Sequence, residues 1–448
     1  MFAPVSARLP TYTRPRGAAA LIDVKDGAWN IRFPYIRIDG TRAGVTIRTE
    51  ITDQCALYAR PEDDFRVEVL VARGGKVPQG MPVLRSRKHP ALTLVAPVAG
   101  EVAAIDLGPG RRLSRMLFFH APESGRYEHD VTAAASGDAA ATRMLLLSAG
   151  LWPSLRSRPF GRIPAPDETP SAIFVMAIDT RPDAPSPRLA LEGREEDLAA
   201  GLRALAGLTA GPVVLCQDRG PDIGGAAGLG GRHPIRKVAP VHPHGLAGFQ
   251  IAACHPAAPG RPVWDIHAED VAAVGALLRT GLVARTRLVS VAGPALRERR
   301  LVRCQPGADL RALSYEIARP GPHRLLSGSL LDGNESRWLG RRHRQVTGIP
   351  DGERDRRPHW FSAALRGARR PLPIIPTAAL DQAFGGALPA APLVRAIAAN
   401  DAETATRLGA LSLTEEDVAL ADYLTGASPR LSTMLRSMLE RIAAEEAT

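Results

Sequence analysis

The apolar residues of this chain come in short runs, and the length of these runs limits what the chain can fold into. The most hydrophobic runs lie at 172–178 and 213–216. A helix needs about 20 consecutive apolar residues to cross the hydrocarbon core of a bilayer. Runs this short instead have the length of buried β-strands. The sequence therefore predicts a chain that contains buried sheets and does not cross a membrane by itself.

Composition and cysteine usage narrow the class of protein further. With 448 residues, 45% of them hydrophobic and 23% charged, the chain has the balance of a globular protein of about three domains. The N-terminal segment contains no apolar core of about 7–15 residues, so we predict no secretion signal and expect the cytoplasm as the compartment. The four cysteines are widely separated and form no C-x-x-C pair, which argues against a disulfide scaffold and a thiolate metal site.

The positive charge of the chain is concentrated in one zone. The net charge is +11, and residues 297–370 carry 17 Arg against 8 acidic residues, a net +9. Residues 371–448 carry 5 Arg against 10 acidic residues, a net −5. A basic zone of this kind can face nucleic acid, anionic lipid or an acidic partner. We expect no nucleic-acid binding, because no RNP, zinc-finger or helix-turn-helix signature accompanies the zone.

Short strands separated by paired glycines predict a barrel-sandwich-like β domain over residues 1–130, with an N-terminus that is harder to interpret. The pattern is clearest at 67–102, which closes with the unit A-P-x-x-G-x-V. Carriers with this flat barrel attach biotin or lipoate to a lysine at a hairpin tip. Lys88 lies instead in a basic loop at 85–90, so we interpret it as a solvated lysine without a cofactor.

The pattern changes after the barrel and predicts a Rossmann-like α/β domain over residues 131–258. Helical spacing at 139–151 and 195–208 alternates with apolar strands at 171–179 and 212–216. Strand, helix and strand in this order are typical of a small parallel sheet.

Polar and glycine-rich segments after these strands are candidate ligand contacts. A strand-end Asp-Thr pair could hydrogen-bond a ligand, although a turn or a helix cap is the favoured role. The glycines at 220–231 could let backbone N–H groups approach a phosphate, but their spacing is not the G-x-G-x-x-G of dinucleotide sites. Neighbouring histidines could bind a metal, but no carboxylate completes the set, so we favour turn histidines and expect no metal. The candidates are Asp179, Thr180, Gly224, Gly228, Gly230, His242 and His244.

The second half of the chain predicts two further units. Strand, helix, strand and strand patterns at 263–304 suit a β-grasp module over residues 259–345. Residues 346–448 predict a helical C-terminal domain, with T-E-E-D at 414–417 as the start of a helix and an amphipathic final helix over 431–447. The expected fold class is therefore a multidomain chain of mixed α/β and α+β type.

Seven stretches of the sequence are informative when they are taken together. They are AGLWPSLRSRPF at 149–160, AIFVMAIDT at 172–180, HPHGLAG at 242–248, SVAGP at 290–294, SGSL at 327–330, LGRRHRQ at 339–345 and LSLTEEDVAL at 411–420. In this order, over most of residues 65–448, they resemble a known family, NqrA, which is the A-type component of the sodium-translocating NADH:quinone reductase, a bacterial respiratory pump. The departures lie in residues 1–30, which do not reproduce the K-x-G-L-D-L-P signature of the family, and in the tail, which lacks cysteines that the family often carries. The chain therefore resembles a divergent member of the family.

The resemblance implies a subunit without cofactors of its own. The family is related in fold to the flavin-binding subunit of complex I and to the C-type subunit of the Rnf complex. No cysteine follows Cys304, so the tail cannot supply the four thiolates of a [4Fe–4S] cluster. Members dock on the B-type membrane subunit at the inner face of the bacterial inner membrane and are associated with the ubiquinone site. NADH oxidation, the flavins, the Fe–S centre and the sodium path belong to other subunits, so this chain is not expected to be catalytic alone.

The resemblance also suggests two sets of contact residues. Trp152, Arg156, Arg158 and Phe160 could hold an anionic head group or stack on a quinone ring, although a loop that pins two domains together is favoured. The set Arg341, Arg342, His343 and Arg344 could form a docking patch or a solvated charged face. We find no Ser/His/Asp, Cys/His or paired-carboxylate arrangement, and therefore no catalytic residue.

Two hypotheses from different classes follow. In the first, the chain is an accessory subunit of a membrane quinone reductase, peripheral to the membrane and held there by its partner subunits. In the second, it is a stand-alone soluble protein that binds a ligand or a nucleotide with the loop at 220–231. Tight nucleotide binding by the purified chain would favour the second hypothesis.

Overall fold

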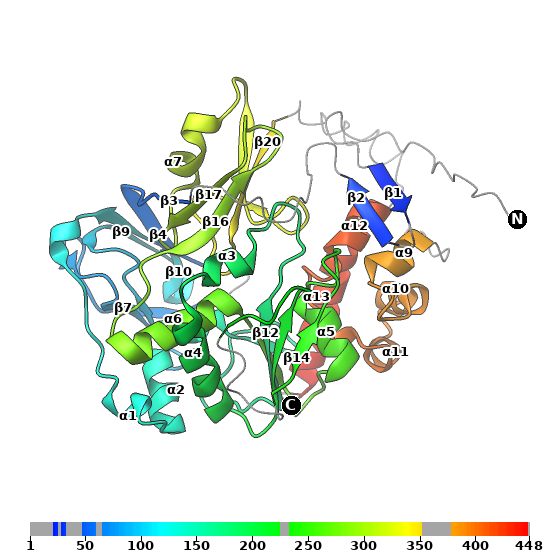
Figure 1. Cartoon of the computed structure of the whole chain (residues 1–448), viewed down its shortest axis with the longest axis horizontal. Coiled ribbons are helices and arrows are strands. Elements are labelled where there is room, and N and C mark those ends of the chain that lie inside the picture. Colours follow the sequence, from blue (N-terminus) through cyan, green and yellow to red (C-terminus); the bar gives the residue numbers. More distant parts are fainter. Residues whose placement is uncertain are drawn as a thin grey trace, which may run out of the picture.

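The structure is a computed structural model, and it describes residues 21–25, 28–32, 47–59, 65–224, 233–351 and 378–446. Sheets dominate up to about residue 350, and helices form the last part of the chain (Figure 1). The first described elements are β1 (Leu21–Lys25) and β2 (Ala28–Arg32), which pair antiparallel as a two-stranded ribbon.

Two small antiparallel sheets form the N-terminal domain and enclose one core. The strand orders are β4-β10-β9-β6 and β5-β7-β8. Met116 of the first sheet and Leu84 of the second are both fully buried in this core. Position 100 accepts only glycine, because the Cβ of any other residue would lie 2.2 Å from the carbonyl oxygen of Phe119. The strands are β4 (Gln54–Tyr58), β5 (Val67–Val69), β6 (Lys76–Val77), β7 (Pro82–Ser86), β8 (Thr93–Val95), β9 (Gly100–Gly108) and β10 (Arg112–His120).

A five-stranded sheet in the order β11-β15-β12-β13-β14 forms the middle of the molecule. Strands β15, β12, β13 and β14 run parallel, and β11 joins the edge antiparallel to β15. Parallel strands with both faces covered are apolar throughout rather than alternating. This explains the uninterrupted apolar run at 172–178. The strands are β11 (Arg156–Arg158), β12 (Ala172–Ala177), β13 (Val213–Gln217), β14 (Ile235–Lys237) and β15 (Val263–His267).

Helices cover both faces of this sheet. Ile173 and Val175 of β12 pack with α4 and α6, whereas Phe174 packs with α5 on the other face (Figure 1). Alternate residues of the same strand therefore belong to two cores, as the pleat of a strand requires. The helices in this region are α1 (Thr132–Ala135), α2 (Ala139–Ser148), α3 (Pro187–Leu191), α4 (Glu195–Gly207), α5 (Ala247–Cys254) and α6 (Ala268–Thr280).

A six-stranded sheet in the order β19-β18-β20-β16-β17-β3 forms the third unit. The sequence grouped the strand at 263–267 and the helix at 268–280 with this unit, but β15 lies between β11 and β12 in the other sheet. Hydrophobic periodicity identifies a strand and not its neighbours, which is the reason for the difference. The elements are β3 (Arg48–Thr49), β16 (Arg287–Ala292), β17 (Arg300–Cys304), α7 (Leu310–Ser314), β18 (His323–Ser327), β19 (Asn334–Glu335) and β20 (Gln345–Pro350).

Helices form the C-terminal part and share a core with α5. Phe249 of α5 contacts Phe384 edge to face, with ring centroids 6.4 Å apart. The final helix was predicted over 431–447 and is confirmed over Leu431–Glu446. Among the described residues, no helix is both long and apolar enough to span a membrane. The helices are α9 (Ala378–Ala383), α10 (Ala390–Ala398), α11 (Ala402–Arg407), α12 (Ala419–Thr425) and α13 (Leu431–Glu446).

Candidate functional site

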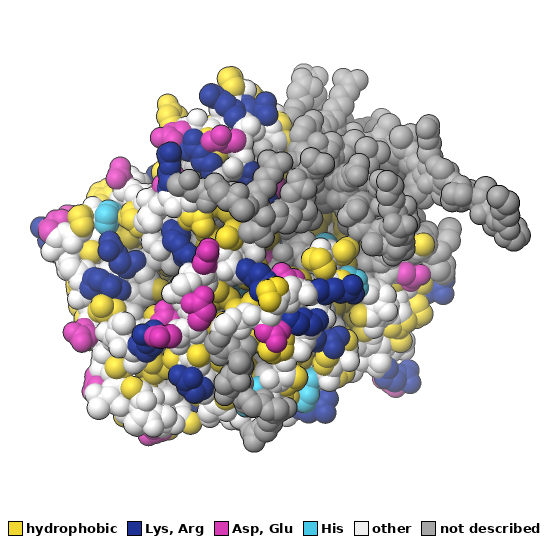
Figure 2. Space-filling view, in the orientation of Figure 1, with side chains coloured by type: hydrophobic (Ala, Val, Ile, Leu, Met, Phe, Trp, Pro, Cys, Tyr) yellow, Lys and Arg dark blue, Asp and Glu magenta, His cyan; other side chains and the backbone are white. Residues whose placement is uncertain are grey.

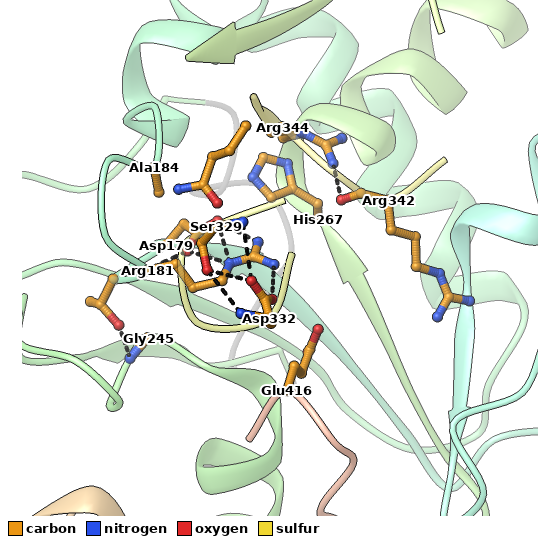
Figure 3. A network of polar contacts seen from close by, with 12 residues as sticks. Asp179, Arg181, Ala184, Gly245, His267, Ser329, Asp332, Arg342, Arg344 and Glu416 are labelled. Atoms are coloured by element: carbon orange, nitrogen blue, oxygen red, sulfur yellow. Dashed lines mark hydrogen bonds and ion pairs between the residues drawn. The ribbon is translucent and has the colours of Figure 1, made fainter. Parts of the chain in front are cut away.

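Buried charged side chains meet where the five-stranded sheet, the six-stranded sheet and the C-terminal helices come together (Figure 3). In open α/β sheets, ligands bind outside the carboxyl ends of the parallel strands, so this edge is the place to look for a site. Asp179 follows the carboxyl end of β12, and His267 ends β15. We call the charged set the charge network. Its members are Arg156, Arg158, Asp179, Arg181, Asp265, Glu269, Asp270, Asp332, Arg344, Glu416 and Asp417.

Arg181 lies at the centre of the charge network and joins two sheets. Its Nε donates to Asp179 Oδ1 at 2.9 Å, and its Nη1 donates to Asp332 Oδ2 at 3.2 Å. Asp332 lies in the turn between β18 and β19, and Ser329 of the same turn donates to it. Burial alone would raise the pKa of the Asp332 carboxyl, but the positive charge of Arg181 lowers it overall. These contacts tie the end of β12 to the six-stranded sheet.

Two arginines of β11 connect the five-stranded sheet to the C-terminal helices. Arg156 Nη2 lies 3.0 Å from Asp265 Oδ2 and 2.5 Å from Glu416 Oε1. Arg158 is fully buried, and its Nε lies 3.0 Å from Asp265 Oδ1 while its Nη1 lies 2.7 Å from Asp417 Oδ2. Strand β11 therefore contributes two guanidinium groups. The carboxylates come from the neighbouring strand β15 and from the segment before α12.

Two carboxylates of this group, Asp265 and Glu416, stay ionised because the charge of their partners outweighs burial, whereas burial raises the pKa of Asp417 despite its contact with Arg158. Burial raises the pKa of Asp265, but Arg156 and Arg158 lower it to below its ordinary value. Glu416 shows the same balance, with burial raising its pKa and the Arg156 guanidinium lowering it well below the ordinary range. A buried charge without a partner would be strongly unfavourable, so each of these groups depends on the others.

Glu269 and Arg344 make a third connection. Glu269 is 2% exposed, and its Oε1 accepts from the backbone N–H of Leu288 at 2.8 Å while Oε2 accepts from Arg344 Nε at 3.1 Å. Arg344 Nη2 also lies 2.8 Å from Asp270 Oδ2. Since Glu269 and Asp270 begin α6 while Leu288 lies in β16, these contacts fix the six-stranded sheet against the helix layer.

Two histidines lie beside the charge network and are neutral near pH 7. Burial lowers the pKa of His242 from 6.5 to about 4, and it lowers that of His267 well below 6.5. His267 Nδ1 accepts from the backbone N–H of Glu269 at 3.1 Å, which leaves its proton on Nε2. Among the described residues, neither His242 Nε2 nor His267 Nε2 has a hydrogen-bond partner, although both atoms are buried.

The chemistry of this arrangement is that of a polar junction. Its carboxylates and arginines are used in ion pairs. The hydroxyls that donate to its carboxylates, Ser329 to Asp332 and Thr414 to Asp417, contact carboxylates that an arginine already holds. The described part of the chain contains no group of three or more His, Cys, Asp and Glu residues placed to hold a metal ion. Burial raises the pKa of the Cys216 and Cys304 thiols to about 12, so neither is a thiolate near pH 7.

The predicted quinone or head-group residues make internal contacts. Trp152 is fully buried, donates from Nε1 to the Pro164 carbonyl at 2.9 Å and lies edge to face against Trp264. Phe160 packs against the core of the C-terminal helices. Arg156, Arg158 and Phe160 contact the C-terminal part of the chain, whereas these contacts of Trp152 stay within the part that contains the five-stranded sheet. A contact with a quinone or an anionic head group stays a prediction.

The strand-end residues among the ligand candidates are also used internally. Asp179 holds Arg181, and Thr180 Oγ1 accepts from the backbone N–H of Gly245 at 3.0 Å. His242 Nδ1 lies 3.4 Å from Thr180 Oγ1, so these two candidates do come together.

The remaining ligand candidates are placed only in part. His244 is half-buried, and its backbone carbonyl accepts from the side-chain amide of Gln250. Gly224 lies beside Glu195, whose Cγ would be 2.8 Å from an added Cβ. Gly228 and Gly230 lie outside the described residues, so the phosphate-binding role of that loop stays a prediction.

The predicted docking residues lie at the domain junction instead of forming a free patch. Arg344 is buried in the charge network and 3% exposed, which corrects its assignment to a surface. Arg342 Nη2 donates to the Leu155 carbonyl at 2.5 Å, and burial lowers its pKa to about 9. His343 Nδ1 is 2.8 Å from Ser327 Oγ, and the Arg341 carbonyl accepts from Arg287. Arg341, Arg342 and His343 remain partly exposed, and their role in docking stays a prediction.

Neutralisation within the chain also applies to the described part of the basic zone, residues 297–351, while residues 352–370 lie outside the described residues. Arg300 pairs with Glu298 and Glu316, and Arg337 pairs with Asp309. Figure 2 shows Lys and Arg side chains interspersed with Asp and Glu over the described part of that face. The net charge of a sequence segment therefore overstates the positive surface that it presents.

Sequence reasoning singled out Asp179 but missed the other carboxylates of the charge network. A signal for Asp265 was present in the sequence, because this aspartate interrupts the apolar strand at 263–266, and a charge within a buried strand needs a partner. Glu416 and Asp417 were assigned to the start of a helix, but α12 begins at Ala419. Asp417 does accept from the backbone N–H of Thr414 at 2.8 Å, as in a capping box, and it also accepts from Arg158.

Comparison with protein families finds three matching domain models. Residues 35–119 match the NqrA N-terminal barrel-sandwich hybrid domain, residues 138–283 the NqrA second alpha/beta domain, and residues 288–337 the NQRA C-terminal domain. The barrel-sandwich prediction for the N-terminal domain is thereby confirmed.

Curated relatives, all named as the A-type component of the Na(+)-translocating NADH-quinone reductase, match over most of their length. The relative from Pseudomonas aeruginosa (strain UCBPP-PA14) is 33% identical over 83% of this chain and 89% of the relative. The one from Actinobacillus pleuropneumoniae serotype 5b (strain L20) is 31% identical over 91% of this chain and 97% of the relative. The one from Tolumonas auensis (strain DSM 9187 / NBRC 110442 / TA 4) is 30% identical over 92% and 98%.

Among solved structures, a chain of an air-oxidized NAD+-reducing [NiFe]-hydrogenase matches with a TM-score of 0.37 and 14% identity, over 68% of this chain and 63% of that one. A likeness at that level does not establish a shared function. The relatives, in contrast, are 30–33% identical over 83–92% of this chain. The chain therefore belongs to the NqrA family, the A-type component of the Na+-translocating NADH-quinone reductase.

Proposed function

We propose that this chain is an accessory subunit of a Na+-translocating NADH:quinone reductase and that it acts with the other subunits of that complex. The observation that carries the proposal is similarity over 83–92% of the chain to proteins named as the A-type component of this enzyme. The chain docks on the B-type membrane subunit at the inner face of the membrane and helps to shape the site of ubiquinone. It binds no cofactor itself, and NADH, flavin and Fe–S chemistry takes place in other subunits.

The charge network supports a role in assembly. It connects β11 to the segment before α12, β12 to the turn before β19, and α6 to β16, through ion pairs and hydrogen bonds of 2.5 to 3.2 Å. Buried pairs of this kind keep a defined geometry, because breaking one leaves an uncompensated charge. A subunit that supports a membrane partner needs a fixed arrangement of its own parts more than it needs a reactive group.

Two finer fold assignments belong to the same proposal. We assign the five-stranded sheet to a Rossmann-like fold, which its parallel order β15-β12-β13-β14 and its helices on both faces support. We assign the six-stranded sheet to a β-grasp fold, which the parallel pair β16 and β20 at its centre and the helix α7 support.

Affinity purification from native membranes tests the proposal. The tagged chain is isolated in mild detergent, and the co-eluting proteins are identified and assayed for sodium-stimulated NADH:quinone reductase activity. We expect the other subunits of the reductase, including the B-type membrane subunit, together with that activity. A strain that carries the tag on an unrelated membrane protein controls for nonspecific recovery. Recovery of the chain alone would contradict the proposal.

Calorimetry on the purified chain tests the part that concerns cofactors. We expect no heat of binding for NADH or for FMN. Tight binding of either compound would contradict the proposal. It would favour the alternative hypothesis, in which the chain is a stand-alone paralogue that binds a ligand or a nucleotide.

A further inference from the structure

A cleft lined by arginines lies between the N-terminal domain, α6 and the six-stranded sheet, and one of its arginines, Arg303, pairs with Glu269 of the charge network. Its volume is about 280 Å³. No aspartate or glutamate of the described chain lines it. Its polar lining consists of Arg126, Arg194, Arg285, Arg303, Thr280 and Thr286.

The four arginines come from different parts of the fold. Arg126 follows β10, Arg194 precedes α4, Arg285 lies between α6 and β16, and Arg303 belongs to β17. Ligand sites occur preferentially where domains meet, because side chains from several elements converge there. The cleft is therefore assembled only in the folded chain.

Two of the arginines have a carboxylate partner at long distance. Arg194 Nε lies 3.5 Å from Asp197 Oδ2, and Asp197 is shared with Arg279. Arg303 Nη1 lies 3.6 Å from Glu269 Oε1, and Glu269 is shared with Arg344. Each of these carboxylates thus serves two cations, although Arg279 also pairs with Glu196 and Arg344 also pairs with Asp270.

The other two arginines have no carboxylate partner among the described residues. Arg126 donates to neutral groups, from Nε to Gln79 Oε1 at 3.0 Å and from Nη2 to the Val283 carbonyl at 2.6 Å. Arg285 is exposed and has no hydrogen-bond or ion-pair partner in the described part of the chain. Burial and the nearby charge of Arg285 both lower the pKa of Arg126, which shows that the two cations repel each other. A bound anion would relieve that repulsion.

We propose that this cleft binds the phosphate group of an anionic ligand, with Arg285 and Arg126 as its principal contacts. Guanidinium groups match the geometry of phosphate oxygens and donate charge-assisted hydrogen bonds to them. The volume lies just below the range of about 300–1,000 Å³ of pockets for drug-sized ligands, so the cleft holds a phosphate or diphosphate group and leaves the rest of a larger ligand outside. The inference is independent of the proposed function, since it rests on the lining of the cleft and not on the family.

Calorimetric titration of the full chain with inorganic pyrophosphate tests the site. We expect saturable binding that weakens as salt is raised. Arg285→Gln should weaken it by at least about tenfold, because it removes a charge-assisted contact. Arg285 has no partner within the described chain, so this variant should fold normally, and its thermal midpoint is measured alongside. Arg126→Gln should weaken binding in the same direction.

The matched control is Arg311→Gln, which removes the same charge from an exposed position on α7. It should bind pyrophosphate as the unmodified chain does. Equal weakening in Arg311→Gln and Arg285→Gln would overturn the proposal, because it would show a general effect of net charge.

Vesicles distinguish the source of the phosphate. Binding to phosphatidic acid vesicles, but not to phosphatidylcholine vesicles, with loss in Arg285→Gln, supports a lipid head group as the ligand. Binding of pyrophosphate with no dependence of vesicle binding on Arg285 supports a soluble phosphate compound. The proposal is overturned if the unmodified chain binds neither pyrophosphate nor phosphatidic acid vesicles.

Discussion

Arg158 illustrates what one buried charge contributes at the scale of a residue. Its guanidinium is fully buried and touches Asp265 of β15, the Ser412 carbonyl and Asp417. The carboxylates belong to parts of the chain more than 100 residues away. If either the arginine or its carboxylate partners are removed alone, the remaining charged group is left buried without a partner.

Truncation of Arg158 should therefore destabilise the chain strongly. We expect Arg158→Ala to lower the free energy of unfolding by about 3–5 kcal/mol, because Asp417 and Asp265 lose their buried partner. Urea denaturation followed by circular dichroism measures the change. The control is Arg162→Ala, an exposed arginine over the Phe160 ring, which should cost less than about 1 kcal/mol. Equal effects of the two substitutions would contradict the role of the buried ion pairs.

The pKa of His242 makes stability depend on pH. In the unfolded chain this imidazole takes up a proton near pH 6.5, but in the folded chain burial delays protonation until about pH 4. Between these values the unfolded state binds one proton more than the folded state. Stability is therefore greatest above the unfolded pKa and falls as the pH drops toward 4. The lowered pKa of His267 adds to this in the same direction.

A substitution of His242 tests this dependence. We expect His242→Gln to lose less stability than the unmodified chain between about pH 7 and about pH 5, because one proton-linked group is gone. Urea midpoints at the two pH values measure the difference. His323→Gln, an exposed histidine of β18, serves as the control and should follow the unmodified chain. An unchanged pH dependence in His242→Gln would show that this residue is not the buried group responsible.

At the scale of elements, the close crossing of α4 and α6 depends on two glycines. A Cβ at Gly275 would lie 1.8 Å from the carbonyl oxygen of Asp197, and one at Gly201 would lie 2.0 Å from that of Val271. Real Cβ atoms do not approach backbone this closely, so the two helices can touch only through glycine. This contact places α6, and with it Glu269, against the sheets.

Adding a methyl group at this crossing should force the helices apart. We expect Gly275→Ala to destabilise the chain by about 1–3 kcal/mol, because the added methyl group would meet the backbone carbonyl of Asp197, which cannot move aside as a side chain could. The matched control is Gly207→Ala at the end of α4, where the nearest atom to a Cβ is that of Ala139 at 3.8 Å. That change should be neutral or stabilising by up to about 1 kcal/mol, since alanine favours a helix. Thermal unfolding compares the two variants, and a stable Gly275→Ala would contradict the crossing.

The elements themselves could largely be predicted, whereas their neighbours could not. The apolar run at 172–178 and the amphipathic pattern at 195–208 correspond to β12 and α4, because local periodicity reports one buried face at a time. The place of β15 in the five-stranded sheet was missed, since pairing depends on contacts with β11 and β12 that are distant in sequence. The T-E-E-D motif at 414–417 does form a capping-box contact, from the backbone N–H of Thr414 to Asp417, but α12 begins only at Ala419, and Asp417 also accepts from the distant Arg158.

At the scale of the whole molecule, Glu269 connects two layers. It accepts from Leu288 at the start of β16 and from Arg344 before β20, and it lies in the first turn of α6. We expect Glu269→Ala to loosen the six-stranded sheet, so that amide exchange in β16 speeds up by at least about tenfold while the five-stranded sheet changes little. Hydrogen exchange with mass spectrometry measures this. The control Glu298→Ala, at an exposed carboxylate, should leave exchange in β16 unchanged. Faster exchange throughout the chain would indicate global unfolding and contradict this local role.

The sequence by itself determined the kinds of element, the barrel-sandwich domain and the family. Short apolar runs and glycine spacing specify secondary structure through neighbouring residues, so they can be recognised in the sequence. Several motifs in a fixed order identify a family even when each motif alone is common. Only the tertiary structure decided which charges meet. Arg156 and Arg344 belonged to contact surfaces in the sequence-based prediction, but their partners Glu416 and Glu269 lie 260 and 75 residues away. A buried guanidinium and a solvated one look alike in a sequence, because burial is a property of the packed elements around the side chain and not of the residue itself.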